Sequence, residues 1–129
     1  MSEPIVFISH SRFKEGGREA LERTMPDAAR QLQAAKPRTL VFLAFVGGDG
    51  TRLDIVHVFA DAASMDLHLE GADERAARAL EFIEPESYEI YGSPSDSSLA
   101  AMRRFADELG APLSVHPGYL GGFLRVGSG

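Results

Sequence analysis

The sequence predicts one α+β domain that spans residues 1–129 and is built on a four-stranded antiparallel sheet. Two observations support this prediction. Segments rich in β-branched and aromatic residues alternate with stretches of helical apolar periodicity in the order β-α-β-β-α-β. In addition, the second and third strand-like segments are apolar on both faces, whereas a sheet with one face in water alternates apolar and polar residues.

The first strand is predicted over residues 4–12 and is followed by a helix whose apolar residues recur from Leu21 to Ala35. Pro26 lies inside this helix and has no N–H to donate, so we expect a kink there, or a fresh start capped by Thr24. Lys36-Pro37 ends the helix, because Pro disfavours a helical conformation of the residue before it.

Residues 39–46 and 51–60 form the predicted second and third strands, joined by a turn in which glycine supplies positive φ angles. Asp61 is a candidate N-cap for a second helix, which Gly71 interrupts and Asp73 restarts. Residues 87–93 are the predicted fourth strand.

This order of elements is the split βαβ, or ferredoxin-like, pattern, and it accounts for residues 5–93. Right-handed crossovers place both main helices on one face of the sheet. Residues 94–129 form a C-terminal extension, with a third helix from the cap at Ser95 to the stop at Gly110. Residues 123–126 are a candidate edge strand.

The two-faced sheet predicts a homodimer. On the second strand Val41, Leu43 and Phe45 point to one face of the sheet. Phe42 and the residues two positions from it along the strand point to the other face, and these are apolar too. Two helices cover only one face, and monomers rarely expose an apolar patch of that size. The other face is therefore covered by a second copy or, alternatively, by the third helix.

Composition excludes several classes of function. The formal charge is −6, and the 13 Lys and Arg residues are scattered among 19 carboxylates, so no basic patch for nucleic acid is present. The longest apolar run, residues 40–46, is too short to span a membrane. With no signal-peptide pattern at the N-terminus and no cysteine, a cytoplasmic location is expected.

Histidines are the candidate catalytic residues. His57 lies in the middle of the apolar third strand, where burial would keep it neutral and able to accept a proton; it could instead be a structural core histidine. His68 lies beside the apolar stripe of the second helix and either lines a pocket or reaches solvent. His10 is on a neighbouring strand, and the strand register decides whether it shares a face with His57. No histidines have metal-site spacing, so no metal is expected.

Residues 59–69 resemble a known family. A strand that ends in the aromatic Phe59 and continues as Asp-Ala-x-x-Met-x-x-His-Leu is similar to the antibiotic-biosynthesis-monooxygenase-like domains of the dimeric α/β-barrel superfamily. The helix start at residues 16–22 and the strand-turn-strand of residues 40–59 are placed as in that family, so the resemblance covers residues 5–93.

The resemblance implies a homodimer whose sheets form a barrel, with a cavity between sheet and helices. Such enzymes oxygenate quinols, anthrones and related small aromatics, typically with no flavin or metal cofactor. His57 or His68 would be the base, with Tyr91, Arg125, His10 and Phe59 as substrate-binding residues. The alternatives are a non-catalytic dimer that binds a small hydrophobic ligand, and an isomerase or lyase that uses the same cavity.

Overall fold

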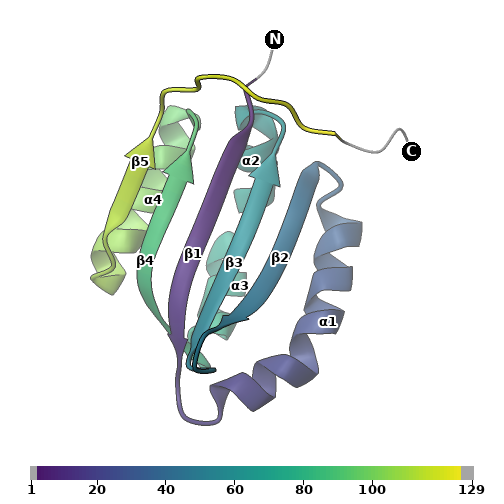
Figure 1. Ribbon diagram of the computed structural model, residues 1–129, viewed down its shortest axis with the longest axis vertical. Coiled ribbons are helices and arrows are strands. Elements are labelled where there is room, and N and C mark those ends of the chain that lie inside the picture. The colour runs from purple at the N-terminus through teal and green to yellow at the C-terminus, as the bar shows by residue number, and fades with distance from the viewer. Residues whose placement is uncertain (1–2, 126–129) are drawn as a thin grey trace.

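The computed structural model describes residues 3–125 and contains one five-stranded mixed sheet, with α2, α3 and α4 behind one of its faces and α1 beside the edge formed by β2 (Figure 1). The strand order is β2-β3-β1-β4-β5, in which β5 is parallel to β4 and the other pairs are antiparallel. The elements are β1 (Ile5–Phe13), α1 (Gly17–Ala35), β2 (Thr39–Gly47), β3 (Arg52–Phe59), α2 (Ala62–Leu69), α3 (Ala72–Ala79), β4 (Ile83–Tyr91), α4 (Asp96–Leu109) and β5 (Leu113–His116).

The ferredoxin-like β-α-β-β-α-β order is confirmed, as are the predicted caps at Asp61, Ser95 and Gly110. The Asp61 carboxylate accepts from the backbone N–H of Ser64 at 2.8 Å and starts α2. The hydroxyl of Ser95 accepts from the N–H of Ser98 at 3.2 Å and starts α4, which ends at Gly110 with φ 67°. The second helix is divided at Gly71, as predicted, into α2 and α3.

The first helix passes through Pro26 without interruption, so the prediction of a fresh start there is wrong. Figure 1 shows that α1 bends along its length, which agrees with the predicted kink. Thr24 does not act as a cap. Its hydroxyl donates to the carbonyl of Ala20 at 3.0 Å, a back-bond within the helix that satisfies the side chain locally.

The fourth strand begins at Ile83, four residues before the predicted start at residue 87 (87 − 83). Pro85 lies within β4 opposite Ser11, and the register with β1 shifts between His10 and Ser11. A bulge is one of the few places where a strand accommodates proline, since the ladder hydrogen bond is already missing there. The proline therefore marks an irregularity in the strand and not its boundary.

Residues 113–116 form β5, a strand that the prediction missed, while residues 123–125 are not a strand. Residue 126, the end of the predicted edge strand, lies outside the described residues. The carbonyl of Pro112 accepts from the N–H of Tyr88, and that of His116 from the N–H of Gly92, each at 2.9 Å. The fifth strand thus continues the sheet beyond β4.

One face of the sheet carries the core. Ile5, Phe59 and Ile90 on this face are buried against Met65 of α2 and Met102 of α4. Because α4 packs on the same face as α2, the alternative in which it covers the opposite face is wrong.

The opposite face, called the open face below, has no helix over it within residues 3–125 (Figure 1). Leu43 and Phe45 of β2 are 50% and 55% exposed there. Pairing places Val56 and Val58 of β3 beside Leu43 and Val41, which extends the apolar surface over two strands. The prediction of a sheet with two apolar faces is confirmed.

Candidate active site between β3 and α2

Two histidines meet on the helix-covered face of the sheet. His57 comes from the middle of β3, and His68 from the last turn of α2. Asp61 caps α2 immediately after β3, and the short helix runs back over the strand. The two imidazole rings lie edge to face with their centroids 5.1 Å apart, and the ring of Phe59 is 5.1 Å from that of His68. Three of the predicted site residues are therefore brought together.

One hydrogen bond fixes the tautomer of His57. Its Nδ1 lies 3.1 Å from the carbonyl oxygen of Phe7, and a carbonyl can only accept, so Nδ1 carries the hydrogen. In the neutral ring Nε2 then keeps its lone pair and is the nitrogen able to take a proton. His68 is held by a hydrogen bond of 2.7 Å between its Nδ1 and the hydroxyl of Thr39.

Burial keeps both imidazoles neutral. His57 is 7% and His68 4% exposed. Desolvation lowers the pKa of His57 to about 4, although the Phe7 carbonyl acts in the opposite direction. Desolvation, followed by the neighbouring charges of His57, Arg75 and Lys36, lowers the pKa of His68 to about 3. At neutral pH the pair consists of two uncharged rings.

The surroundings of His57 are aromatic. Phe7 stacks on its ring at 4.9 Å between centroids, Phe42 meets it edge-on at 5.2 Å, and Phe59 lies at 6.3 Å. Flat apolar side chains around a neutral base favour a planar, weakly polar ligand over a charged one. The chemistry available here is removal of a proton in a nearly water-free environment.

His10 and Tyr91 do not join this cluster. Strand pairing places Phe7 opposite His57 but His10 opposite Asp54, so His10 projects from the open face, and Tyr91, paired with Val6, does the same. The predicted site residues are thus divided between the two sides of the sheet. Strand register decides this, and the sequence alone does not fix the register.

On the open face His10 lies between two carboxylates. Its Nδ1 donates to Asp54 at 2.7 Å and its Nε2 to Glu89 at 2.5 Å. Tyr91 donates its hydroxyl to the other oxygen of Glu89 at 2.5 Å, and its ring stacks on His116 at 4.5 Å. Asp54 and Glu89 were not predicted, because their meeting with His10 also depends on strand register.

Two effects act on the pKa of His10. Partial burial lowers it, but hydrogen bonds to Glu89 and Asp54 and the charges of the two carboxylates outweigh burial and raise the pKa overall. The two carboxylates therefore favour the imidazolium form of His10, whereas burial favours the neutral form of His57.

Arg125, the remaining predicted site residue, lies in the C-terminal tail, with its guanidinium 5.2 Å from the ring centroid of Phe123. Within residues 3–125 no group of three or more His, Asp or Glu side chains is arranged to hold a metal ion. In that same part of the chain, no helix has the length and apolarity needed to cross a membrane.

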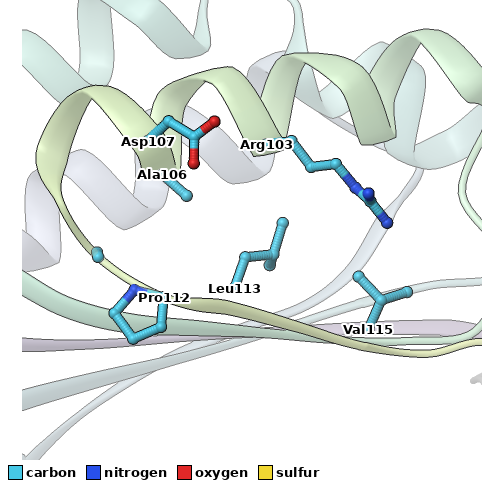
Figure 2. Close-up of a pocket in the computed structure, with 7 residues that line it drawn as sticks. Arg103, Ala106, Asp107, Pro112, Leu113 and Val115 are labelled. Carbon is cyan, nitrogen blue, oxygen red and sulfur yellow. The ribbon is translucent and has the colours of Figure 1, made fainter.

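Two open grooves lie away from the histidine pair. The larger, of about 480 Å³, is at the sheet edge between α4 and β5, where Leu113 and Val115 point toward the helix that carries Arg103 and Asp107 (Figure 2). A second, of about 330 Å³, lies between α3 and α4 and is lined in part by Leu80 and Phe105. Neither groove is lined by a histidine.

Comparison with known proteins identifies the fold. No family model matches the sequence, and no curated protein matches it. Among solved structures, MupZ from Pseudomonas fluorescens is 17% identical, with a TM-score of 0.69 and coverage of 96% of both chains. SnoaB, a cofactor-independent oxygenase from Streptomyces nogalater, is 13% identical with a TM-score of 0.59, covering 73% of this chain and 96% of its own.

A protein from Chloroflexus aurantiacus assigned as an antibiotic biosynthesis monooxygenase is 17% identical with a TM-score of 0.55, covering 68% of this chain and 90% of that one. The chain therefore has the fold of antibiotic-biosynthesis-monooxygenase-like domains, as the sequence resemblance implied. The match to MupZ spans nearly the whole chain, whereas these two other matches span about the length of the ferredoxin-like core.

Proposed function

We propose that the protein is a cofactor-independent monooxygenase that oxidises a small electron-rich aromatic, such as a quinol or an anthrone, with O₂. The observation that carries this proposal is the His57 imidazole, which is neutral, fixed through Nδ1 and surrounded by aromatic rings. The shared fold with SnoaB supports it.

The proposed reaction begins with proton transfer from the substrate to Nε2 of His57. The resulting carbanion or phenolate hands one electron to O₂, and the two radicals combine to form a peroxide. For an anthrone, loss of water then converts the reacting CH₂ to C=O, so that one oxygen atom enters the product and the other leaves as water. Phe7, Phe59 and His68 would hold the planar substrate beside His57 and exclude bulk water.

Oxygen uptake with a panel of quinols and anthrones tests this function. We expect consumption of one O₂ per substrate, and a loss of at least a hundredfold in kcat in His57→Gln, since positioned general bases typically contribute ~10²- to 10⁴-fold. The matched control is His116→Gln, which changes a histidine of β5 far from the pair in the strand order. Full activity in His57→Gln would exclude His57 as the base.

The rival functions are an isomerase or lyase, and a non-catalytic binding protein. Of these two rivals, the isomerase or lyase is the one that the neutral base favours, because His57 can take a proton from the substrate and return it without O₂. Substrate turnover under strictly anaerobic conditions would show an isomerase or lyase, and binding of aromatics without turnover in air would show a binding protein.

We also propose that the open face pairs with a second copy to form a homodimer. Val41, Leu43 and Phe45 of β2, with Val56 and Val58 of β3, form an apolar surface that water would otherwise cover. Sedimentation equilibrium checks this: the expected mass is twice the 14.0 kDa of the chain, and a single 14.0 kDa species at all micromolar concentrations would contradict it.

A further inference from the structure

Large exposed apolar side chains in the described residues gather in two places. One is β2, and the other is the C-terminal tail, defined here as residues 117–125; only Leu67, on α2, lies elsewhere. The members on β2 are Leu40, Leu43, Phe45 and Val46, and those in the tail are Tyr119, Leu120, Phe123 and Leu124.

The tail leaves the sheet at one end and crosses that end. Strand pairing places Tyr91 beside His116, and it places Ile5 and Thr39 beside Phe59 at the same end. The tail begins directly after His116 and passes across the strand ends from β5 toward β2 (Figure 1). It is therefore an arm laid along the rim of the sheet, outside the core.

The arm has few interactions with its own subunit. The hydroxyl of Ser93 donates to the carbonyl of Pro117 at 3.3 Å, at the very start of the arm. Farther along, Leu120 is 102% and Phe123 78% exposed. Neither side chain is removed from water by its own subunit. Exposed apolar surfaces of this kind typically mark interaction sites.

The arm does not cover the apolar surface of its own β2. It reaches the end of β2 at which Thr39 lies, whereas Phe45 is six residues farther along that strand (45 − 39). At ~3.3 Å per residue this is a separation of ~20 Å. Leu43 and Phe45 remain half exposed, although the arm is in place.

We propose that the arm of each copy binds β2 of a second copy, where Leu120 and Phe123 pack on Leu43 and Phe45. This rests on the proposed homodimer and adds a specific contact to it. In a two-fold symmetric pair both copies give an arm and receive one, so both exposed groups become buried together. A different partner protein that covered β2 would leave the arms in water, and one that bound the arms would leave β2 exposed.

Dimer dissociation constants test the exchange. The variants are a chain that ends at Pro117 and the double variant Leu120→Ser/Phe123→Ser, with Leu67→Ser as a matched control because Leu67 is an exposed apolar residue outside both groups. We expect dimerisation at least tenfold weaker in the two arm variants, as burial of a large apolar side chain is worth about that much, and no change in the control. An unchanged constant in both arm variants would overturn the exchange and leave the homodimer standing. A wild-type chain that stays monomeric would overturn both.

Photo-crosslinking locates the contact. The chain has no cysteine, so Phe123→Cys carries a single benzophenone-maleimide, and this protein is mixed with ¹⁵N-labelled wild type. We expect crosslinked peptides of residues 40–47 with ¹⁵N mass, which come from the other copy. Crosslinks confined to unlabelled peptides of the same chain, or to ¹⁵N peptides away from β2, would overturn the proposal. Neither experiment depends on the oxygenase activity.

Discussion

The rings of His57 and His68 lie edge to face at 5.1 Å, so a proton added to either ring faces an imidazole and no carboxylate. The hydrogen-bond partners of the two rings are the Phe7 carbonyl and the Thr39 hydroxyl. Arg75 adds repulsion, because its guanidinium donates to the carbonyl of His68 at 2.5 Å and its charge lowers the pKa of both histidines. These contacts favour the uncharged form of both imidazole rings.

Acid should destabilise the protein in a window set by these histidines. An unfolded histidine has a pKa near 6.5, whereas burial holds the pKa of His57 at about 4, so the unfolded state binds more protons between these values. Stability is therefore full above pH 6.5 and lost as the pH falls toward 4, by about 3 kcal/mol for His57 alone.

Urea unfolding at pH 7.0 and pH 4.5 measures this loss, with His57→Asn as the comparison. The asparagine variant has no ionisable group at this position, so its stability should depend less on pH over the same interval. Equal pH dependence in the two proteins would mean that His57 is protonated in the folded state.

Activity should persist into mild acid. If His57 is the base, its low pKa keeps the imidazole available well below pH 6.5, and the acid limb of kcat/KM should be centred near pH 4 and not at the value of an ordinary histidine. The measurement is the pH profile of oxygen uptake from pH 4 to 8. A limb centred at 6.5 would point to a more exposed histidine.

Raising the pH should destabilise the protein through deprotonation of His10. The pKa of His10 is raised by its two carboxylates despite partial burial, so its stabilising charge is fully present below pH 6.5 and is lost as the pH rises through the higher folded value. His10→Gln should remove this alkaline dependence and cost about 1 kcal/mol at pH 7, since the pair is only partly buried.

Thermal unfolding of the wild type and His10→Gln from pH 6 to 9 provides the measurement. His116→Gln is the control, because His116 is more exposed and its hydrogen bond, to the hydroxyl of Ser114, involves no carboxylate. If the wild type and His10→Gln shift in parallel over this range, His10 is not the titrating group.

Gly17→Ala should destabilise the start of α1. A Cβ at this position would strike the backbone carbonyl of Phe82, which has no rotamer through which to move away. The expected cost is about 1–3 kcal/mol, typical of overpacking. Gly48→Ala is the control, since a Cβ there meets nothing within 4 Å, and its unfolding midpoint in urea should stay close to that of the wild type.

The sequence was sufficient for the elements that depend on local signals. Asp61, Ser95 and Gly110 act where predicted because a cap is defined by a few neighbouring residues. The fifth strand was missed because Leu113–His116 is only four residues long and follows a proline, although its apolar and polar residues do alternate.

The site was predicted in part for the same reason. His57, His68 and Phe59 are close in sequence, so the β3–α2 connection brings them together wherever the other strands lie. His10 was separated from them, and joined to Asp54 and Glu89, by pairings between residues 44 and 79 positions apart. A one-residue slip in these pairings would exchange the two faces, and no local pattern excludes such a slip.

The histidine pair is contained in twelve consecutive residues, from His57 to His68, with Asp61 capping the turn between them. A segment this short closes a small loop, which costs little chain entropy and forms early relative to contacts between distant strands. The strand–cap–helix unit consequently brings the two rings together by itself, while Phe7 of β1 and Thr39 of β2 supply the hydrogen bonds that orient them once the distant strands have paired.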